Sequence, residues 1–218
     1  MAEEFTGFPV AALDFYDDLE MDNTKSFWTA HKNVYDSAVK APMLALCAAL
    51  EMEFGPAKVF RPYRDMRFAG SGRAKAPYKT HQGAFVGVAA ATGYYIQIGA
   101  PGVRVGGGFY HAESADLARI RAAIDDERTG RELEKLLAKL SRAGLEVGGE
   151  QLKRPPRGFD ADHPRVELLK HKSLTAGRDY GFEDVIHTSE LLALVRRDWR
   201  WMRPLVEWIS DRIGETPA

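Results

Sequence analysis

The sequence predicts an α+β fold, with a central antiparallel sheet of short strands at about residues 59–105 and helices on its N-terminal and C-terminal sides. Apolar residues recur at helical spacing near both ends of the chain, whereas the middle consists of short segments typical of strands. Because these strands follow one another without intervening helices, an alternating parallel fold is disfavoured. A chain of 218 residues can enclose one sizeable core, so we expect a single domain over residues 1–218.

Three helices are predicted before the sheet. Pro9 suits the first turn of the first helix, and Thr24 is a plausible N-cap for the second. Pro42 should break or kink that second helix, because a proline removes a backbone hydrogen bond. A third helical stretch continues to Phe54, where Gly55-Pro56 provides a stop signal.

Four short strands are predicted in the middle of the chain. They cover residues 59–68, 84–89, 94–98 and 103–105. Thr92-Gly93 and Pro101-Gly102 are turn signals between the last three strands, which favours a meander. Gly106-Gly107-Gly108 is expected to end the sheet.

Helices return at Ser114. Leucine-rich stripes on either side of Gly130 predict two helices, and Gly144 is a natural residue to follow the second. The remaining expectations are a short helix over residues 164–172, an irregular segment over 173–186 and a final helix over 188–213. Pro204 should kink or divide that final helix.

Positive charge gathers in two segments of an otherwise acidic chain. The overall composition, 45% apolar and 28% charged, is that of a globular protein, and the net charge of −1 says nothing about partners. Residues 60–81, however, hold six basic residues and one acid, and residues 151–172 hold six basic residues and three acids. The two segments therefore carry +5 and +3, which leaves −9 for the rest of the chain. Such local charge is expected around a binding site.

The first basic segment begins with a dense group of arginines. If it is extended, alternation puts Arg61, Tyr63, Asp65 and Arg67 on one face and Arg64 on the other. Two guanidinium groups beside one carboxylate keep spare donors in a geometry that suits phosphate or carboxylate. The alternative is that Asp65 only neutralises its neighbours in a structural network.

Lys79 and His81 lie at the end of the same segment and would point the same way from a strand. A lysine near several arginines loses its proton more readily, and histidine titrates near neutrality. Either residue could therefore serve as an acid or a base. The alternative is a structural role, since no nucleophile is evident beside them.

The second basic segment begins with Lys153, Arg154 and Arg157, held on a backbone that Pro155-Pro156 stiffens. Fixed cations bind anions at a lower entropic cost.

Asp160, Asp162 and His163 follow this cluster. The simplest interpretation makes Asp162 a helix N-cap. Alternatively, the three side chains could bind a metal, or His163 could be a base that a carboxylate orients.

Several kinds of site are not indicated. The P-loop lysine, the spaced Rossmann glycines and the common hydrolase and redox motifs are absent from the sequence, so we expect no cofactor and no metal. Cys47 is the only cysteine, which excludes an intramolecular disulfide and a thiolate cluster. With no secretory signal and no run of about 18 apolar residues, we expect a cytoplasmic protein without membrane contact.

The sequence resembles an uncharacterised, mainly bacterial family, domain of unknown function 2461, over nearly the whole chain. The matching motifs are Phe5-x-Gly7-Phe8-Pro9, Asn23-x-Lys25, His31-Lys32, Tyr35, Phe60 to Phe68, Pro77-Tyr78-Lys79-Thr80-His81, Gly106 to Tyr110, Leu152-Lys153-Arg154, Pro156-Arg157-Gly158 and Asp162-His163-Pro164. The resemblance implies no activity, because the family has none established.

We favour a protein that binds, and could transform, an anionic small molecule with a phosphate or carboxylate group, in a pocket where the two basic segments meet. The expected ligand-binding residues are Arg61, Arg64, Asp65, Arg67, Lys153, Arg154 and Arg157, and the acid–base candidates are Lys79, His81 and His163.

Two alternatives stay open. Nucleic acid could bind the same cations, with Tyr63, Phe68 and Tyr78 stacking on bases. The chain could instead be an interaction module, with Trp199, Trp201 and Trp208 forming a partner surface. Catalysis and oligomeric state are left open.

Overall fold

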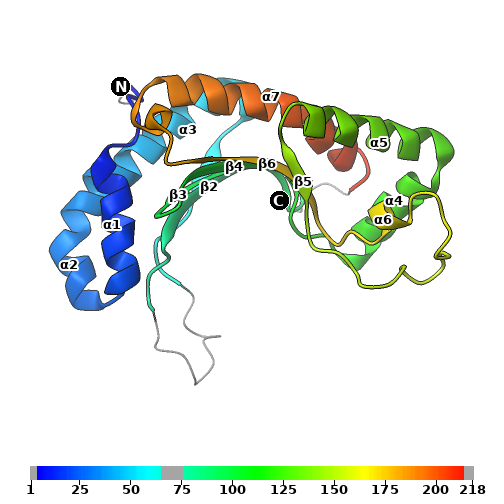
Figure 1. Cartoon of the computed structure of the whole chain (residues 1–218), viewed down its shortest axis with the longest axis horizontal. Coiled ribbons are helices and arrows are strands. Elements are labelled where there is room, and N and C mark those ends of the chain that lie inside the picture. The colour runs from blue at the N-terminus through cyan, green and yellow to red at the C-terminus, as the bar shows by residue number, and fades with distance from the viewer. Residues whose placement is uncertain (1–3, 65–75, 214–218) are drawn as a thin grey trace. The chain divides into compact units, whose positions relative to one another are not determined.

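The computed structural model describes residues 4–64 and 76–213, and its elements confirm the α+β class (Figure 1). Six strands pair in the order β1-β2-β3-β4-β6-β5. Their bounds are β1 Ala57–Val59, β2 His81–Ala89, β3 Thr92–Gly99, β4 Gly102–Phe109, β5 Glu146–Gly148 and β6 Leu174–Gly181. The consecutive strands β2, β3 and β4 are neighbours, as the predicted meander requires.

The described residues form two compact units. The first comprises residues 4–64, 76–86, 95–104 and 179–196, and the second comprises 87–94, 105–178 and 197–213. Each unit is therefore described by itself.

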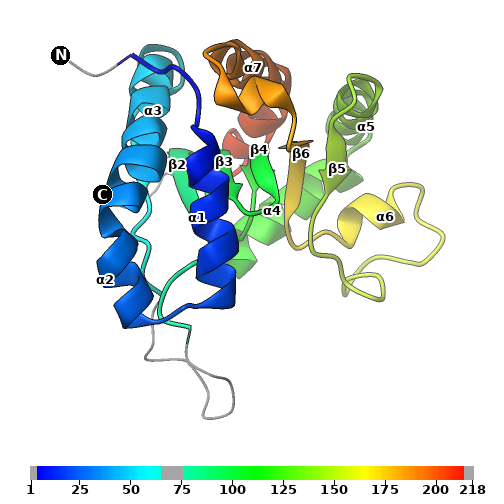
Figure 2. The same ribbon diagram turned by 60° about the vertical axis from the view of Figure 1, so that its left-hand side comes forward.

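The first unit contains the N-terminal helices. These are α1 Val10–Met21, α2 Lys25–Val34, the π-helix η1 Tyr35–Lys40, α3 Ala41–Phe54 and the 3-10 helix η3 Asp184–His187. Helices α1 and α2 lie side by side in both ribbon views (Figures 1 and 2). The predicted cap is confirmed, because the Thr24 hydroxyl accepts a hydrogen bond from the Phe27 N–H at 3.2 Å.

Pro42 does not break the helix as expected. The turn before it widens into η1, in which the Ala41 N–H bonds the Asp36 carbonyl five residues back, and α3 then continues. A widened turn accommodates a proline, which clashes with a carbonyl four residues back in an α-helix. The core of this unit includes Phe8, Tyr16, Leu46, Ile98 and Ile186.

The second unit contains α4 Ser114–Asp125, α5 Glu127–Arg142 and the short α6 Val166–Leu169. Helix α5 buries a leucine stripe formed by Leu133, Leu137 and Leu140, as its spacing predicts. Asp126 caps α5 by accepting a hydrogen bond from the Thr129 N–H at 2.9 Å. Helix α7, Glu190–Ser210, follows η3, and its residues 197–210 belong to this unit.

Three further local predictions are wrong. Residues 174–181 are not irregular but form β6, which pairs with β5 antiparallel. Gly106-Gly107-Gly108 does not end the sheet but lies inside β4, and a Cβ on Gly108 would lie 2.2 Å from the Leu174 carbonyl oxygen. Pro204 does not divide α7, which continues through it between buried residues. In each case packing against a distant segment overrides the local signal.

None of the helices among the described residues combines the length and the apolar character needed to cross a membrane.

Candidate functional site

The two ends of the first basic segment lie side by side in the first unit. The Arg64 N–H bonds the Pro77 carbonyl at 2.9 Å, and the Lys79 N–H bonds the Pro62 carbonyl at 2.7 Å. These two bonds flank an antiparallel pair formed by Tyr63 and Tyr78. The residues between them, 65–75, lie outside the described part of the chain and include the predicted site residues Asp65 and Arg67.

This pairing decides which side chains share a face. Residues opposite each other in an antiparallel pair project to the same side, so Tyr63 and Tyr78 share one face and their neighbours Arg64 and Lys79 share the other. By the same alternation Arg61 belongs with Tyr63. The face of Lys79 also holds Phe60, whose ring centroid is 5.4 Å from the lysine Nζ.

Arg64 and Lys79 act together on His81. Partial burial lowers the pKa of His81, and the positive charges of Lys79 and Arg64 lower that pKa further. The imidazole is therefore neutral at pH 7 and can accept a hydrogen bond or a proton. Arg64, Lys79 and His81 thus lie within one unit, and their joint role in a site stays a prediction.

The face that Tyr63 and Tyr78 share lies against the N-terminal helices. The Tyr78 ring stacks on Trp28 with centroids 4.3 Å apart, and Tyr78 is 5% exposed. Tyr63, in contrast, is 53% exposed. The centroid of its ring lies 6.0 Å from that of Trp28 and 5.5 Å from that of Tyr78. Of the three aromatics proposed for stacking on bases, Tyr78 is therefore buried, Tyr63 is accessible, and Phe68 lies outside the described residues.

Two buried or half-buried amides fix the segment that carries Lys79. The Asn23 side chain donates to the Tyr78 carbonyl at 3.1 Å and accepts from the Tyr78 N–H at 3.0 Å. The Gln82 amide donates to the Phe60 carbonyl at 2.8 Å and accepts from the Tyr35 hydroxyl at 2.6 Å. Burial raises the pKa of that Tyr35 hydroxyl to about 12, so it stays a donor.

The site extends onto β3 and β4 through residues that the sequence reasoning missed. Tyr95 lies across β2, because a Cβ added to Gly83 would be 2.5 Å from its hydroxyl oxygen. The Tyr95 hydroxyl donates to the Gln97 side chain at 2.9 Å. Burial raises the pKa of Tyr95, while the positive charge of Arg104, on the neighbouring strand β4, acts to lower it.

We name Arg64, Lys79, His81, Tyr95 and Arg104 the cationic sheet face. Within residues 4–64 and 76–213, no carboxylate forms an ion pair with its two arginines or its lysine. The sequence does contain a signal for these residues. Tyr95 and Gln97 alternate with the apolar residues of β3, and Arg104 lies between two valines of β4, which indicates that all three share the opposite face of the sheet from the apolar residues.

The second basic segment lies in the second unit. Lys153, Arg154 and Arg157 are all exposed, and no described carboxylate pairs with them. That they join the first segment in one pocket stays a prediction.

His163 is held in a network of the second unit. Its Nε2 lies 3.0 Å from Asp125, and its Nδ1 accepts a hydrogen bond from the Arg165 N–H at 3.0 Å. Both ring nitrogens are thus occupied. Asp162 does not cap a helix as expected, because α6 begins only at Val166. No group of three or more metal-binding side chains occurs among the described residues.

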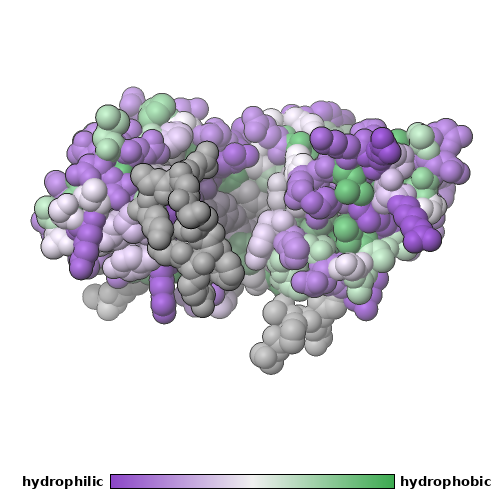
Figure 3. All heavy atoms as spheres, turned by 90° about the horizontal axis from the view of Figure 1, so that it is seen from below, coloured by the Kyte–Doolittle hydropathy of each residue, from purple (hydrophilic) through white to green (hydrophobic). Residues whose placement is uncertain are grey.

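The tryptophans of α7 differ in exposure. Trp199 and Trp208 are buried, whereas Trp201 is 38% exposed and lies under the Lys139 ammonium group. The expected partner surface would therefore have to rest on Trp201 rather than on all three residues. The face seen in Figure 3, from below, is mostly hydrophilic, with hydrophobic residues in small patches.

A model of the family described as "Conserved hypothetical protein (DUF2461)" matches residues 11–208. The chain belongs to this family. Among solved structures, an uncharacterized protein from Methanothermobacter thermautotrophicus is similar, with 16% identity, 77% of this chain and 95% of that chain covered, and a TM-score of 0.39. No curated protein matches the chain.

The structure shows why distant motifs of this DUF2461 protein belong together. Asn23 and Tyr35 come from the N-terminal helical region, yet they hold the backbone of Tyr78 and the side chain of Gln82. Gly7, in another motif, lies so close to His187 that a Cβ would be 2.3 Å from its carbonyl carbon. The motifs that contain Asn23 and Tyr35 thus support the segment that carries Lys79 and His81.

Proposed function

We propose that the protein binds an anionic small molecule, phosphorylated or carboxylated, on the cationic sheet face of its first unit. The supporting observation is that Arg64 and Lys79 both lie near a neutral His81 and lack a described carboxylate partner. A group of cations that has no counter-charge among the described residues is expected to attract an anion.

The side chains offer an anion complementary contacts. The Arg64 guanidinium suits bidentate binding, and Lys79 supplies a point charge. Each charge-assisted hydrogen bond contributes about 1.5–3 kcal/mol, so two of them give about 3–6 kcal/mol before the cost of ordering long side chains. Neutral His81 could accept a proton from a bound substrate if there is turnover, and the same arrangement serves binding alone.

The second basic segment is a further candidate for the same ligand. Its cations Lys153, Arg154 and Arg157 are exposed in the second unit and would attract the same class of anion. The variant Arg157→Ala tests this contribution separately. We also propose a cytoplasmic location, in keeping with a single buried cysteine.

A thermal-shift screen of the full chain tests the proposal, with phosphate, nucleotides, sugar phosphates and small carboxylates as probes. At a hundredfold excess over the dissociation constant, a ligand stabilises the folded state by about 2.7 kcal/mol. We expect one anion class to raise the melting temperature of the wild type and not that of Arg64→Ala.

Two controls keep the test specific. Arg61→Ala removes the same charge from the opposite face of the same segment, and Lys135→Ala removes an exposed charge from α5. Both variants should respond like the wild type. An equal loss in Arg61→Ala and Arg64→Ala, or no response to any anion, would refute the proposed site.

Short oligonucleotides in the same screen address the alternative of nucleic-acid binding, which the accessible Tyr63 beside Arg61 favours. Such binding should weaken steeply with salt and depend on Arg61 and Tyr63. A response confined to oligonucleotides would replace the small-anion proposal.

A further inference from the structure

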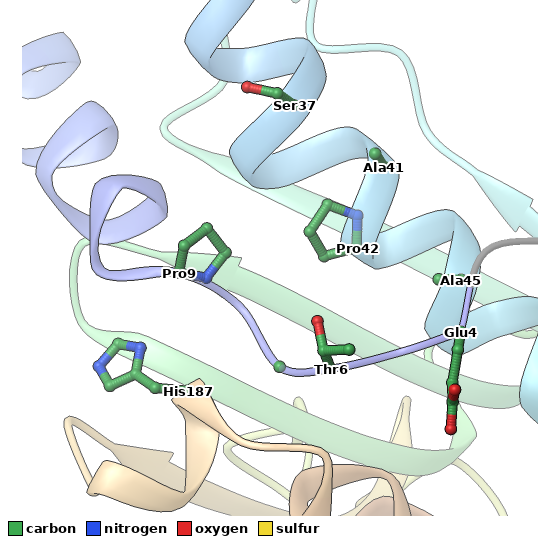
Figure 4. Close-up of a pocket in the computed structure, with 9 residues that line it drawn as sticks. Glu4, Thr6, Pro9, Ser37, Ala41, Pro42, Ala45 and His187 are labelled. Carbon is green, nitrogen blue, oxygen red and sulfur yellow. The ribbon is translucent and has the colours of Figure 1, made fainter.

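Helix α3 presents apolar residues to solvent as well as to the core. The core residues on its buried side are Met43, Leu46, Cys47, Leu50 and Phe54. Another side, with Pro42 and Ala45, faces the N-terminal segment across a cavity (Figure 4). The only charged residues among its 14 positions are Glu51 and Glu53. A helix that is apolar all round is normally buried all round, so its exposed side calls for a partner.

This exposed side of α3 is an apolar ridge with a charge at each end. Leu44 is 47% exposed and Met52 is 99% exposed, and Ala48 between them is also exposed. Residues four apart align along one ridge of a helix, so these three follow one another over about 12 Å. Lys40 continues the ridge before Leu44, and Glu51, seven residues after Leu44, lies on the same side at the other end. Helices pack against each other along ridges of this kind.

The charges at the two ends lack partners among the described residues. Neither Lys40 nor Glu51 forms an ion pair within residues 4–64 and 76–213, and both are exposed. Eleven positions apart in the sequence, they lie about 16 Å apart along the helix and cannot pair with each other. Glu53, in contrast, lies 3.6 Å from the Arg196 guanidinium. A partner of the ridge should therefore offer an acidic group to Lys40 and a basic group to Glu51.

A second copy of α3 in antiparallel orientation meets this requirement. A two-fold axis across the middle of the ridge brings Lys40 of each copy beside Glu51 of the other. In the same register Leu44 of each copy lies opposite Ala48 of the other, so that a large side chain meets a small one. A parallel pair would instead place Lys40 against Lys40 and Leu44 against Leu44. We infer that the protein self-associates through this ridge of α3 as a two-fold symmetric dimer.

This dimer is expected to be reversible. One pair of helix ridges buries less surface than the about 1,200–2,000 Å² of stable complexes. The contacts of Leu44 and Met52 are apolar and favour association by removing exposed apolar surface from water. Protein concentration should therefore decide the oligomeric state.

Analytical ultracentrifugation of the full chain, from about 1 μM to 1 mM, tests the inference. The wild type should change reversibly from monomer to dimer over this range. Ala48→Glu places a charge at the centre of the interface and should weaken the dimer more than about thirtyfold, while glutamate keeps the helix. The matched control Ala11→Glu, exposed on α1, should dimerise like the wild type. A monomer at every concentration, or a dimer that Ala48→Glu leaves intact, would overturn the inference.

Exchanging the two end charges tests the antiparallel orientation. Lys40→Glu alone and Glu51→Lys alone each bring like charges together across the interface, and each should weaken the dimer about five- to tenfold. The double variant restores opposite charges in reversed order and should dimerise within about twofold of the wild type. Misfolding caused by either single change would not be repaired by the other. If the double variant dimerised no better than the single variants, the antiparallel pairing would be wrong.

Discussion

Replacing Asn23 by alanine should destabilise the first unit, because this side chain takes the place of a neighbouring strand for Tyr78. The bonds from Arg64 to Pro77 and from Lys79 to Pro62 flank Tyr78, so its own N–H and carbonyl point away from that pairing. Asn23 bonds both groups, at 3.0 and 3.1 Å. Its loss leaves two backbone groups of a buried residue without that partner.

The cost follows from these two bonds. Each contributes about 0.5–1.5 kcal/mol net, and an unpaired buried group costs about 1–3 kcal/mol, so we expect a loss of about 2 kcal/mol for Asn23→Ala. For a chain of this length that corresponds to a melting temperature lower by about 4–8 °C. Urea unfolding followed by circular dichroism measures the free energy directly.

Two further variants sharpen this measurement. Asn23→Asp keeps the acceptor for the Tyr78 N–H but loses the donor, so about half of the destabilisation should remain. Asn33→Ala, on the exposed surface of α2, should change the stability by less than about 0.5 kcal/mol. If Asn23→Ala were as stable as Asn33→Ala, the role of Asn23 as a strand substitute would be wrong.

Other consequences can be measured on the same protein. Because the pKa of His81 is lowered from 6.5, the folded state binds fewer protons than the unfolded chain below that pH, so the protein loses stability as the pH falls. Lys79→Met should raise the pKa of His81 in an NMR titration. An unchanged pKa would contradict the role of Lys79. Gly7→Ala should cost more than about 2 kcal/mol in urea unfolding, through strain and a clash with His187, whereas Gly158→Ala, with a positive φ but open space, should cost about 1 kcal/mol. Burial raises the pKa of Cys47 to about 11, so a thiol reagent at pH 8 should modify it only on unfolding, and rapid modification of the folded chain would disprove its burial.

The sequence alone predicts a structural feature correctly where the signal for that feature is local. Thr24 as a cap and the leucine stripe of α5 follow from spacing alone, because they depend on one helix. It does not predict a feature that depends on pairing with a segment far away in the sequence. The strand β6 has weak strand character of its own and is held by its pairing with β5, while Gly108 stays in β4 because its neighbour approaches too closely for a side chain.

The same distinction governs the candidate site. Alternation predicted that Lys79 and His81 project together, but it could not say which arginine joins them. That choice depends on the register between residues 60–64 and 76–81, and the pairing of Tyr63 with Tyr78 selects Arg64 over Arg61. A register shifted by one residue would reverse the choice, since side chains alternate with period two. The comparison of Arg64→Ala with Arg61→Ala therefore tests the register and the proposed function together, because only this pairing gives the two arginines different roles.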